Sequence, residues 1–194
     1  MKRNYFAIII FNTSFFGGQI LTLNNNQPIV GDVLQNAFTT TYATQHSFSG
    51  SGLVLDFSTL PNQGMANNSY TLPNSSEISN YVETNLKWFN GFEHNFFYKT
   101  TANGLDISGI NASNYNLNYK IKKATLYNYP VSYGYSNHDT VEGTFSIIGV
   151  PNMSSFTGIQ KGNIDTSADA EGTIILPNGT FNFVRVKKIG RAHV

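Results

Sequence analysis

Residues 171–188 read EGTIILPNGTFNFVRVKK, and this stretch decides the fold class. Two runs rich in Ile, Thr, Phe and Val flank Pro177-Asn178-Gly179. Asn and Gly tolerate the backbone conformations that a tight turn requires. The sequence therefore predicts that Glu171–Leu176 and Thr180–Lys187 pair as a β-hairpin.

The second strand of this hairpin carries apolar residues on both faces. Phe181 and Phe183 share one face with Arg185, while Asn182 and Val184 lie on the other, because successive side chains of a strand alternate. We therefore expect the strand to be buried on both sides near its start.

The rest of the chain has the same β-rich character. Only 12% of its residues are charged, and Asn, Ser, Thr and Gly supply most of the polarity. Short runs of Val, Ile, Thr, Tyr and Phe alternate with turn residues, which is typical of sandwiches and barrels. We predict a single all-β domain over residues 19–188, an antiparallel β-sandwich of the jelly-roll or Ig-like kind. Its other strands are expected at Val30–Leu34, Thr39–Phe48, Leu53–Phe57, Asn95–Thr100, Leu105–Ile110, Leu117–Lys122 and Thr140–Ile148.

One segment, residues 76–86, has the pattern of a short helix. Ser76 and Glu77 suit a helix start, and apolar residues then recur at helical spacing. They are Ile78, Tyr81, Val82 and Leu86.

The first 18 residues have the outline of a secretory signal peptide. Lys2 and Arg3 precede the apolar run Tyr5–Phe11, and small residues follow at Gly17 and Gly18. This order matches the basic, apolar and small-residue regions of such leaders. The alternative is a first core strand with a basic start. On the signal-peptide interpretation the mature chain begins at Gln19, contains no transmembrane span and is secreted or attached to the cell surface.

The mature chain has neither disulfides nor a basic surface signature. The sequence contains no cysteine, so its stability depends on the core and the sheet. Over residues 19–188, 9 Lys and Arg face 11 Asp and Glu, a net charge of −2. No basic arm or stripe is present, which argues against nucleic acid as a partner.

Three segments resemble a family of secreted Bacteroidetes proteins. They are GLVLDFSTL at 52–60, LYNYPVSYGYSNHDTVEGTFSI at 126–147 and AEGTIILPNGTFNFVRVKK at 170–188. The likeness is to the N-terminal β-rich portion of proteins that carry a C-terminal type A sorting domain of the type IX secretion system. It implies export and a partnership with that secretion machinery through the sorting domain. The chain departs from the pattern at Leu55, where the family usually has Trp, and at Thr173, where an intervening Trp-Gly is missing.

The last six residues, IGRAHV, match the translation of ATC GGA AGA GCA CAC GTC, the start of a widely used sequencing adaptor. We interpret Ile189–Val194 as a non-native tail that follows a fragment of the native reading frame, cut at or near Lys188. On this interpretation the sorting domain is missing from the fragment. We also expect the tail to pack against nothing.

The richest candidate for ligand binding is LYNYPVSYGYSNHD, residues 126–139. Aromatic faces beside Asn and Asp side chains can hold sugar rings, which are apolar on one face and hydroxylated at the edge. The alternative is that two or more of these tyrosines cap the core with their hydroxyls at the surface. The candidate residues are Tyr127, Tyr129, Tyr133 and Tyr135.

An alternating acidic run is a candidate calcium site. An extended backbone would direct Asp165, Ser167, Asp169 and Glu171 to one side, and Ca²⁺ prefers such oxygen ligands. The alternative is a solvated loop that enters a strand. No other cofactor is indicated.

Asp139-Thr140-Val141 fits the short Asp-Thr-aliphatic acceptor pattern for O-glycans in the same phylum, which makes Thr140 a candidate modification site.

No sequence pattern indicates catalysis. His46, His94 and His138 have no metal-binding spacing, and no nucleophile elbow or phosphate-binding loop is present. The sequence thus favours a noncatalytic secreted or cell-surface module, used in adhesion or glycan contact. Two alternatives remain open, a carbohydrate-active enzyme and a structural spacer domain.

Overall fold

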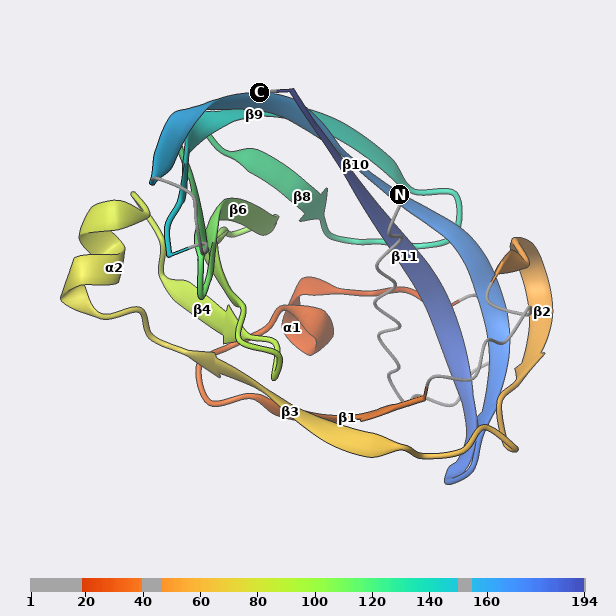
Figure 1. Cartoon of the computed structure of the whole chain (residues 1–194). Helices are drawn as coiled ribbons and strands as arrows, with labels where there is room; N and C mark the ends of the chain where they lie inside the picture. Colours follow the sequence, from red (N-terminus) through yellow and green to blue (C-terminus); the bar gives the residue numbers. More distant parts are fainter. Residues whose placement is uncertain (1–18, 40–46, 150–154, 194) are drawn as a thin grey trace.

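The computed structural model describes residues 19–39, 47–149 and 155–193. Within these ranges the chain forms one mixed sheet of 11 strands and two short helices. The sheet curves around an interior in which the first helix lies (Figure 1). The predicted all-β class is confirmed. The predicted sandwich is not confirmed, because the strands belong to one hydrogen-bonded sheet.

The neighbours in the sheet follow the order β1-β3-β4-β5-β6-β7-β9-β10-β11, while β2 pairs with β10 and β8 pairs with β6. The helices are α1 (Leu23–Asn26) and α2 (Ser75–Asn80). The strands are β1 (Val33–Phe38), β2 (Gly50–Asp56), β3 (Gly64–Thr71), β4 (Leu86–Phe89), β5 (Asn95–Thr100), β6 (Gly104–Ala112), β7 (Tyr115–Lys122), β8 (Ala124–Asn128), β9 (Ser136–Ile147), β10 (Phe156–Leu176) and β11 (Gly179–His193).

The predicted hairpin is confirmed. Strands β10 and β11 pair in antiparallel fashion over the whole length of β11. The pairing starts beside the turn, where Leu176 lies opposite Gly179. Phe183 and Val184 are each 1% exposed, so the start of β11 is buried on both faces as expected. Asp169 lies in a bulge, because the register shifts between Ala168 and Ala170.

A purely antiparallel arrangement is wrong for one pair, since β2 runs parallel to β10. Gly172 makes this approach possible. A Cβ atom at this position would lie 2.0 Å from the carbonyl oxygen of Leu53 on β2. Only glycine leaves room for the neighbouring backbone there.

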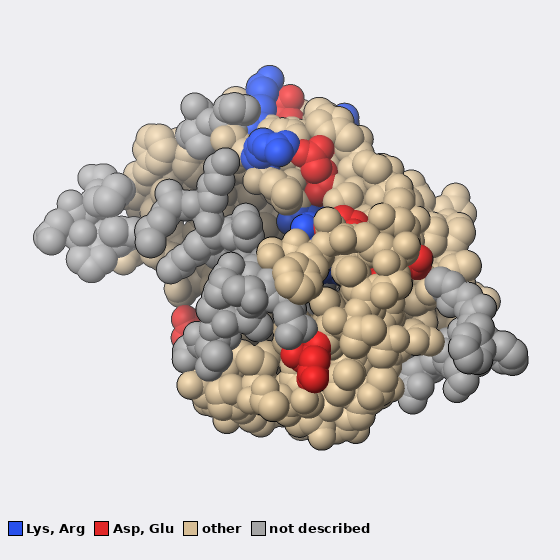
Figure 2. All heavy atoms as spheres, turned by 90° about the vertical axis from the view of Figure 1, so that its right-hand side faces the viewer, with Lys and Arg blue, Asp and Glu red and all other residues tan. Residues whose placement is uncertain are grey.

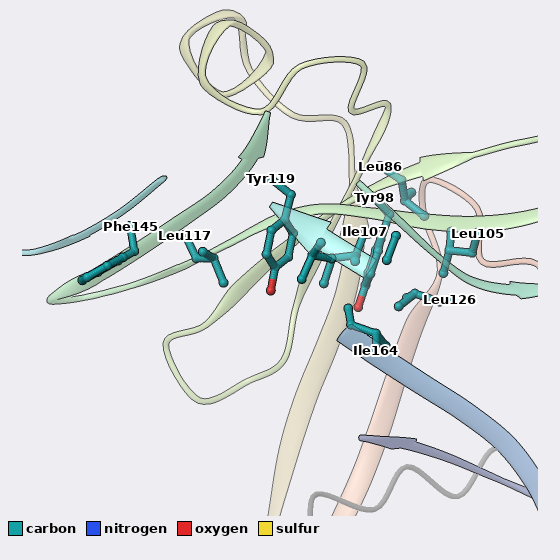
Figure 3. Close-up of a cluster of buried hydrophobic side chains, with 11 residues drawn as sticks. Leu86, Tyr98, Leu105, Ile107, Leu117, Tyr119, Leu126, Phe145 and Ile164 are labelled. Carbon is teal, nitrogen blue, oxygen red and sulfur yellow. The ribbon is translucent and has the colours of Figure 1, made fainter. Parts of the chain in front are cut away.

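The largest core cluster draws buried residues from β4 through β10. Figure 3 shows side chains from these strands converging, among them Tyr98, Ile107, Leu126 and Ile164. Sheet pairing also sets Tyr70, Trp88 and Phe96 beside one another. Tyr70 and Trp88 stack with ring centroids 6.1 Å apart, and Trp88 lies 4.8 Å from Phe96. All three rings are partly buried and pack against the cluster.

The strand predictions succeeded unevenly. β5 has the predicted bounds, and the other predicted strands that fall on described residues overlap observed ones. The sequence missed β3, β4 and β8. The prediction for Thr39–Phe48 falls mostly on residues 40–46, outside the described ranges.

The predicted helix exists but is shorter and begins earlier. Asn74 caps α2, since its side chain accepts from the Glu77 backbone N–H at 2.9 Å while the Glu77 carboxylate accepts from the Asn74 N–H at 2.7 Å. This reciprocal pair is a capping box. The helix ends at Asn80, and Leu86 belongs to β4.

The predicted signal peptide lies outside the described residues. Among the residues that the structure describes, no helix is long and apolar enough to cross a membrane. Described structure begins at Gln19, and Leu21 soon exchanges two backbone hydrogen bonds with Val131, at 2.8 and 2.9 Å.

The expectation that the tail packs against nothing is wrong. Ile189–His193 continue β11 and pair with Lys161–Asp165 of β10. Ladder hydrogen bonds join backbone groups, so residues of almost any sequence that follow a paired strand can extend the pairing. The adaptor origin of these residues stays a prediction.

Deleting Ile189–Val194 is expected to lower the free energy of unfolding by about 1 kcal/mol, because the net gain from ladder hydrogen bonds is largely offset by the entropy of ordering the tail. Denaturant melts measure the change. Arg191→Ala is the matched control. Its exposed side chain adds little, so we expect a change within about 0.5 kcal/mol. If Arg191→Ala lowered the free energy of unfolding by more than this, side-chain contacts and not backbone pairing would hold the tail.

Candidate functional site

Two of the predicted tyrosines form the wall of a pocket. Tyr127 lies on β8, one residue before the strand ends at Asn128, and Tyr129 follows just after the strand. Their ring centroids lie 5.3 Å apart at an interplanar angle of 74°. Both rings are half-buried and pack against a buried cluster. Its members are Leu21, Val131, Ala168 and Val184. The rings thus pack against core residues, as the core-capping alternative expects, but the Tyr129 hydroxyl is buried and does not lie at the surface.

The pocket beside these rings is small and apolar. It has a volume of about 20 Å³, the size of a methyl group or a single water molecule. Three separate parts of the chain build it: the N-terminal segment with α1, the β8–β9 connection and β11. The lining residues are Leu21, Asn26, Tyr127, Tyr129, Val131 and Val186.

Two buried polar atoms of the lining residues have no hydrogen-bond partner. They are the Asn26 Nδ2 and the Tyr129 hydroxyl oxygen. The other amide atom of Asn26, Oδ1, accepts from the Thr22 backbone N–H at 2.7 Å, which fixes the orientation of the amide. The Tyr127 hydroxyl approaches Tyr129 closely enough to influence its pKa, but the two do not meet hydrogen-bonding geometry. Asn26 and Tyr129 thus present N–H and O–H donors that the protein leaves unused.

The tyrosine hydroxyls stay protonated at physiological pH. Burial raises the pKa of Tyr129 to about 12, although the neighbouring Tyr127 hydroxyl acts in the opposite direction. Burial also raises the pKa of Tyr127, and proximity to Tyr129 adds to the effect. Both groups therefore remain neutral hydrogen-bond donors.

The other two predicted tyrosines have different surroundings. Tyr135 packs against the same cluster, and its hydroxyl accepts from the Asn128 backbone N–H at 2.9 Å. Tyr133 is 42% exposed and is not among the residues that line the pocket. The structure thus brings three of the four together and leaves Tyr133 on the surface.

Sequence reasoning missed four of the six pocket residues, namely Leu21, Asn26, Val131 and Val186. Leu21 and Asn26 precede the predicted tyrosines by about 100 residues, and Val186 follows them by more than 50. No local sequence pattern therefore marks these residues as parts of one pocket. The one available signal was the apolar Leu21 close after the predicted cleavage point, which is 5% exposed in the structure.

The acidic run alternates as predicted, but two of its carboxylates, Asp165 and Asp169, form ion pairs. Asp165, Ser167, Asp169 and Glu171 are partly exposed, while the residues between them are buried or less exposed. Asp165 pairs with His138 and Arg191. Within the described ranges, no three His, Cys, Asp or Glu side chains gather in a way that could hold a metal ion. The calcium hypothesis for Asp165, Asp169 and Glu171 therefore gains no support and stays a prediction.

Among the basic side chains that pair with this acidic run, the most buried is Arg185, which contacts Asp169. Arg185 donates to it through Nε at 2.8 Å and through Nη2 at 3.0 Å, and the Arg185 side chain is only 3% exposed. Lys187 makes a further ion pair. Partial burial alone would raise the pKa of Asp169, but the hydrogen bonds and charges of Arg185 and Lys187 outweigh it and hold the pKa below its usual value.

The outer face of β9 and β10 carries polar side chains around Thr140 and Lys161, with Ile159 exposed beside them. Register sets Thr140 opposite Asn163, and Lys161 opposite Glu142, with which it forms a 2.9 Å salt bridge. Thr140 is exposed, so the candidate modification site is accessible, although its hydroxyl contacts Lys122. Figure 2 shows basic and acidic side chains next to one another, with mostly uncharged surface around them.

Comparison with known proteins adds no assignment. No family model, no curated protein and no solved structure matches the chain.

Proposed function

We propose that this chain is a noncatalytic secreted or cell-surface module that contacts glycans through the pocket at Tyr127 and Tyr129. The observation that carries the proposal is the pair of aromatic rings at 74° beside two buried donors without partners. Aromatic walls with a few directed polar groups are the usual chemistry of sugar sites.

Burial of the donors supports a role for a ligand. Buried polar groups in proteins are nearly always hydrogen-bonded, and each exception calls for an explanation. Asn26 and Tyr129 are two such exceptions at one pocket. A glycan offers hydroxyl, ring and substituent oxygens that can accept from both.

A glycan array with the purified protein tests the proposal. We expect binding to a defined set of glycans, and we expect Tyr129→Ala to abolish it. Tyr133→Ala is the matched control, because Tyr133 lies in the same connection but outside the pocket, and should bind like the wild type. An empty array with a folded protein would favour the structural spacer, and release of sugar products would favour an enzyme.

Export is a separate prediction that follows from the basic start and the apolar run of residues 1–18. When the gene is expressed in a Bacteroidetes host, the folded product is expected to begin near Gln19. The described structure is compatible with this boundary, because Leu21, two residues later, is buried against Val131. N-terminal sequencing gives the answer, and recovery of Met1 on the folded protein would contradict the prediction.

A further inference from the structure

We infer that the pocket recognises an acetamido group, whose methyl enters the pocket and whose carbonyl oxygen accepts from Asn26 and Tyr129. The inference rests on the proposed glycan function and specifies its ligand as an N-acetylated sugar. It combines the pocket's size, its lining and its unused donors.

Size and lining select the methyl group. A volume of about 20 Å³ admits a methyl group but not a sugar ring, so only a substituent of the sugar can enter. The side chains of Leu21, Val131 and Val186 form apolar walls together with the two tyrosine rings. A hydroxyl group placed there would lose its hydrogen bonds to water, whereas a methyl group gains from leaving water.

The donors select a neutral carbonyl. A carbonyl oxygen has two lone pairs, so it can accept from the Asn26 Nδ2 and the Tyr129 hydroxyl at once. None of the six lining residues is charged. A carboxylate or phosphate would therefore lose its hydration without meeting a cation, which favours an amide over an anionic group.

Calorimetric titration of the full chain with di-N-acetylchitobiose and with cellobiose tests the inference. The two disaccharides have the same backbone and linkage, and they differ in the acetamido or hydroxyl group at one carbon of each ring. We expect di-N-acetylchitobiose to bind at least tenfold more tightly. Equal binding of both would overturn the acetamido inference and leave the glycan function standing. Absence of binding to either, with glycans of other kinds bound on the array, would also overturn it, while an empty array would overturn both proposals.

Two variants locate the recognition. Tyr129→Phe removes only the hydroxyl, and Asn26→Asp keeps the Oδ1 position that accepts from Thr22 while it replaces the Nδ2 donor with oxygen. Each is expected to reduce the preference for the acetylated sugar roughly tenfold, the effect of one lost hydrogen bond. Tyr133→Phe should leave the preference unchanged. Thermal melts confirm that each variant is folded, and an unchanged preference in a folded Tyr129→Phe protein would contradict the assignment.

Discussion

Replacing Asp169 with alanine is expected to lower the free energy of unfolding by about 3 to 5 kcal/mol. The change leaves the Arg185 guanidinium, 3% exposed, without the carboxylate that holds it through two hydrogen bonds. Arg185 keeps its hydrogen bond to the Phe48 carbonyl oxygen, but its charge stays buried without the carboxylate that balanced it, and removing one partner of a buried ion pair costs this much. Chemical denaturation of the wild type and the variant measures the difference.

Asp165→Ala provides a control on the same strand. Asp165 also contacts two basic side chains, those of His138 and Arg191, but they are 63% and 61% exposed. Exposed pairs contribute about 0 to 1 kcal/mol, so the loss should stay below about 1 kcal/mol. Equal effects of the two substitutions would show that burial of Arg185 does not set the stability of the hairpin.

The double variant Asp169→Leu with Arg185→Met separates the cost of an orphaned charge from the value of the pair. Apolar side chains of similar size often replace a buried ion pair at little cost or with a gain. We expect the double variant to be more stable than Asp169→Ala. A double variant as unstable as the single one would mean that the pair itself makes a large net contribution.

The same pair predicts a pH dependence. The pKa of Asp169 is lower in the folded protein than its ordinary value, so the folded state favours the ionised form. The stabilisation is complete above the unfolded-state pKa of about 3.9 and is lost as the pH falls towards the folded-state pKa. Between pH 7 and pH 3, the wild type should therefore lose more stability than Asp169→Asn. Parallel loss in both proteins would contradict this assignment.

The hairpin could be predicted from the sequence because its signals are local. The turn residues Pro177-Asn178-Gly179 and the alternation of Phe183 with Val184 lie within a few positions of one another. The structure confirms both the pairing and the burial of both faces. The helix α2 was predicted one residue late, from Ser76, and its cap Asn74 was missed although the capping box joins residues only three positions apart.

The way β2 and β8 join the sheet could not be predicted, because it depends on contacts between distant segments. β2 pairs in parallel with β10, more than 100 residues later, and this approach depends on the missing side chain of Gly172. The pairing of β8 with β6 turns Tyr127 inward towards Leu21 and Val186. The clustered tyrosines of residues 126–139 therefore pointed to four candidates, of which Tyr127 and Tyr129 line the pocket, and the sequence offered no signal for Asn26.

For the acidic run, the sequence could predict which face the side chains share but not which groups they contact. Alternation correctly directs Asp165 and Asp169 to one face, but the choice between a metal ion and cationic side chains depends on the neighbouring strands. Register places Lys187 opposite Ser167 and His138 opposite Asp165, and Arg185 pairs with the bulged Asp169. The bulge itself follows no sequence pattern that we identified.

Phe183→Ala is expected to lower the free energy of unfolding by about 3 to 5 kcal/mol, as large truncations in close-packed cores do. Phe183 is 1% exposed and packs with residues of β2 and β10 in a cluster separate from the main core. The members of that cluster include Leu55, Phe57, Ala170 and Ile174. Because the opposing residue is Gly172, which has no side chain, its neighbours cannot easily fill the space that the ring leaves.

Val54→Ala is the matched control for this truncation. Val54 lies on β2 next to Leu55, but it is 65% exposed, so its replacement should change stability by no more than about 0.5 kcal/mol. Urea melts of both variants decide the question, with the slope of the transition checked for a change in the unfolded state. If Phe183→Ala fails to fold, Phe183→Leu retains part of the apolar volume and should show a smaller loss in the same direction. A Phe183→Leu protein as stable as the wild type would contradict the view that this ring joins β2 to the hairpin and so holds the parallel pair in place.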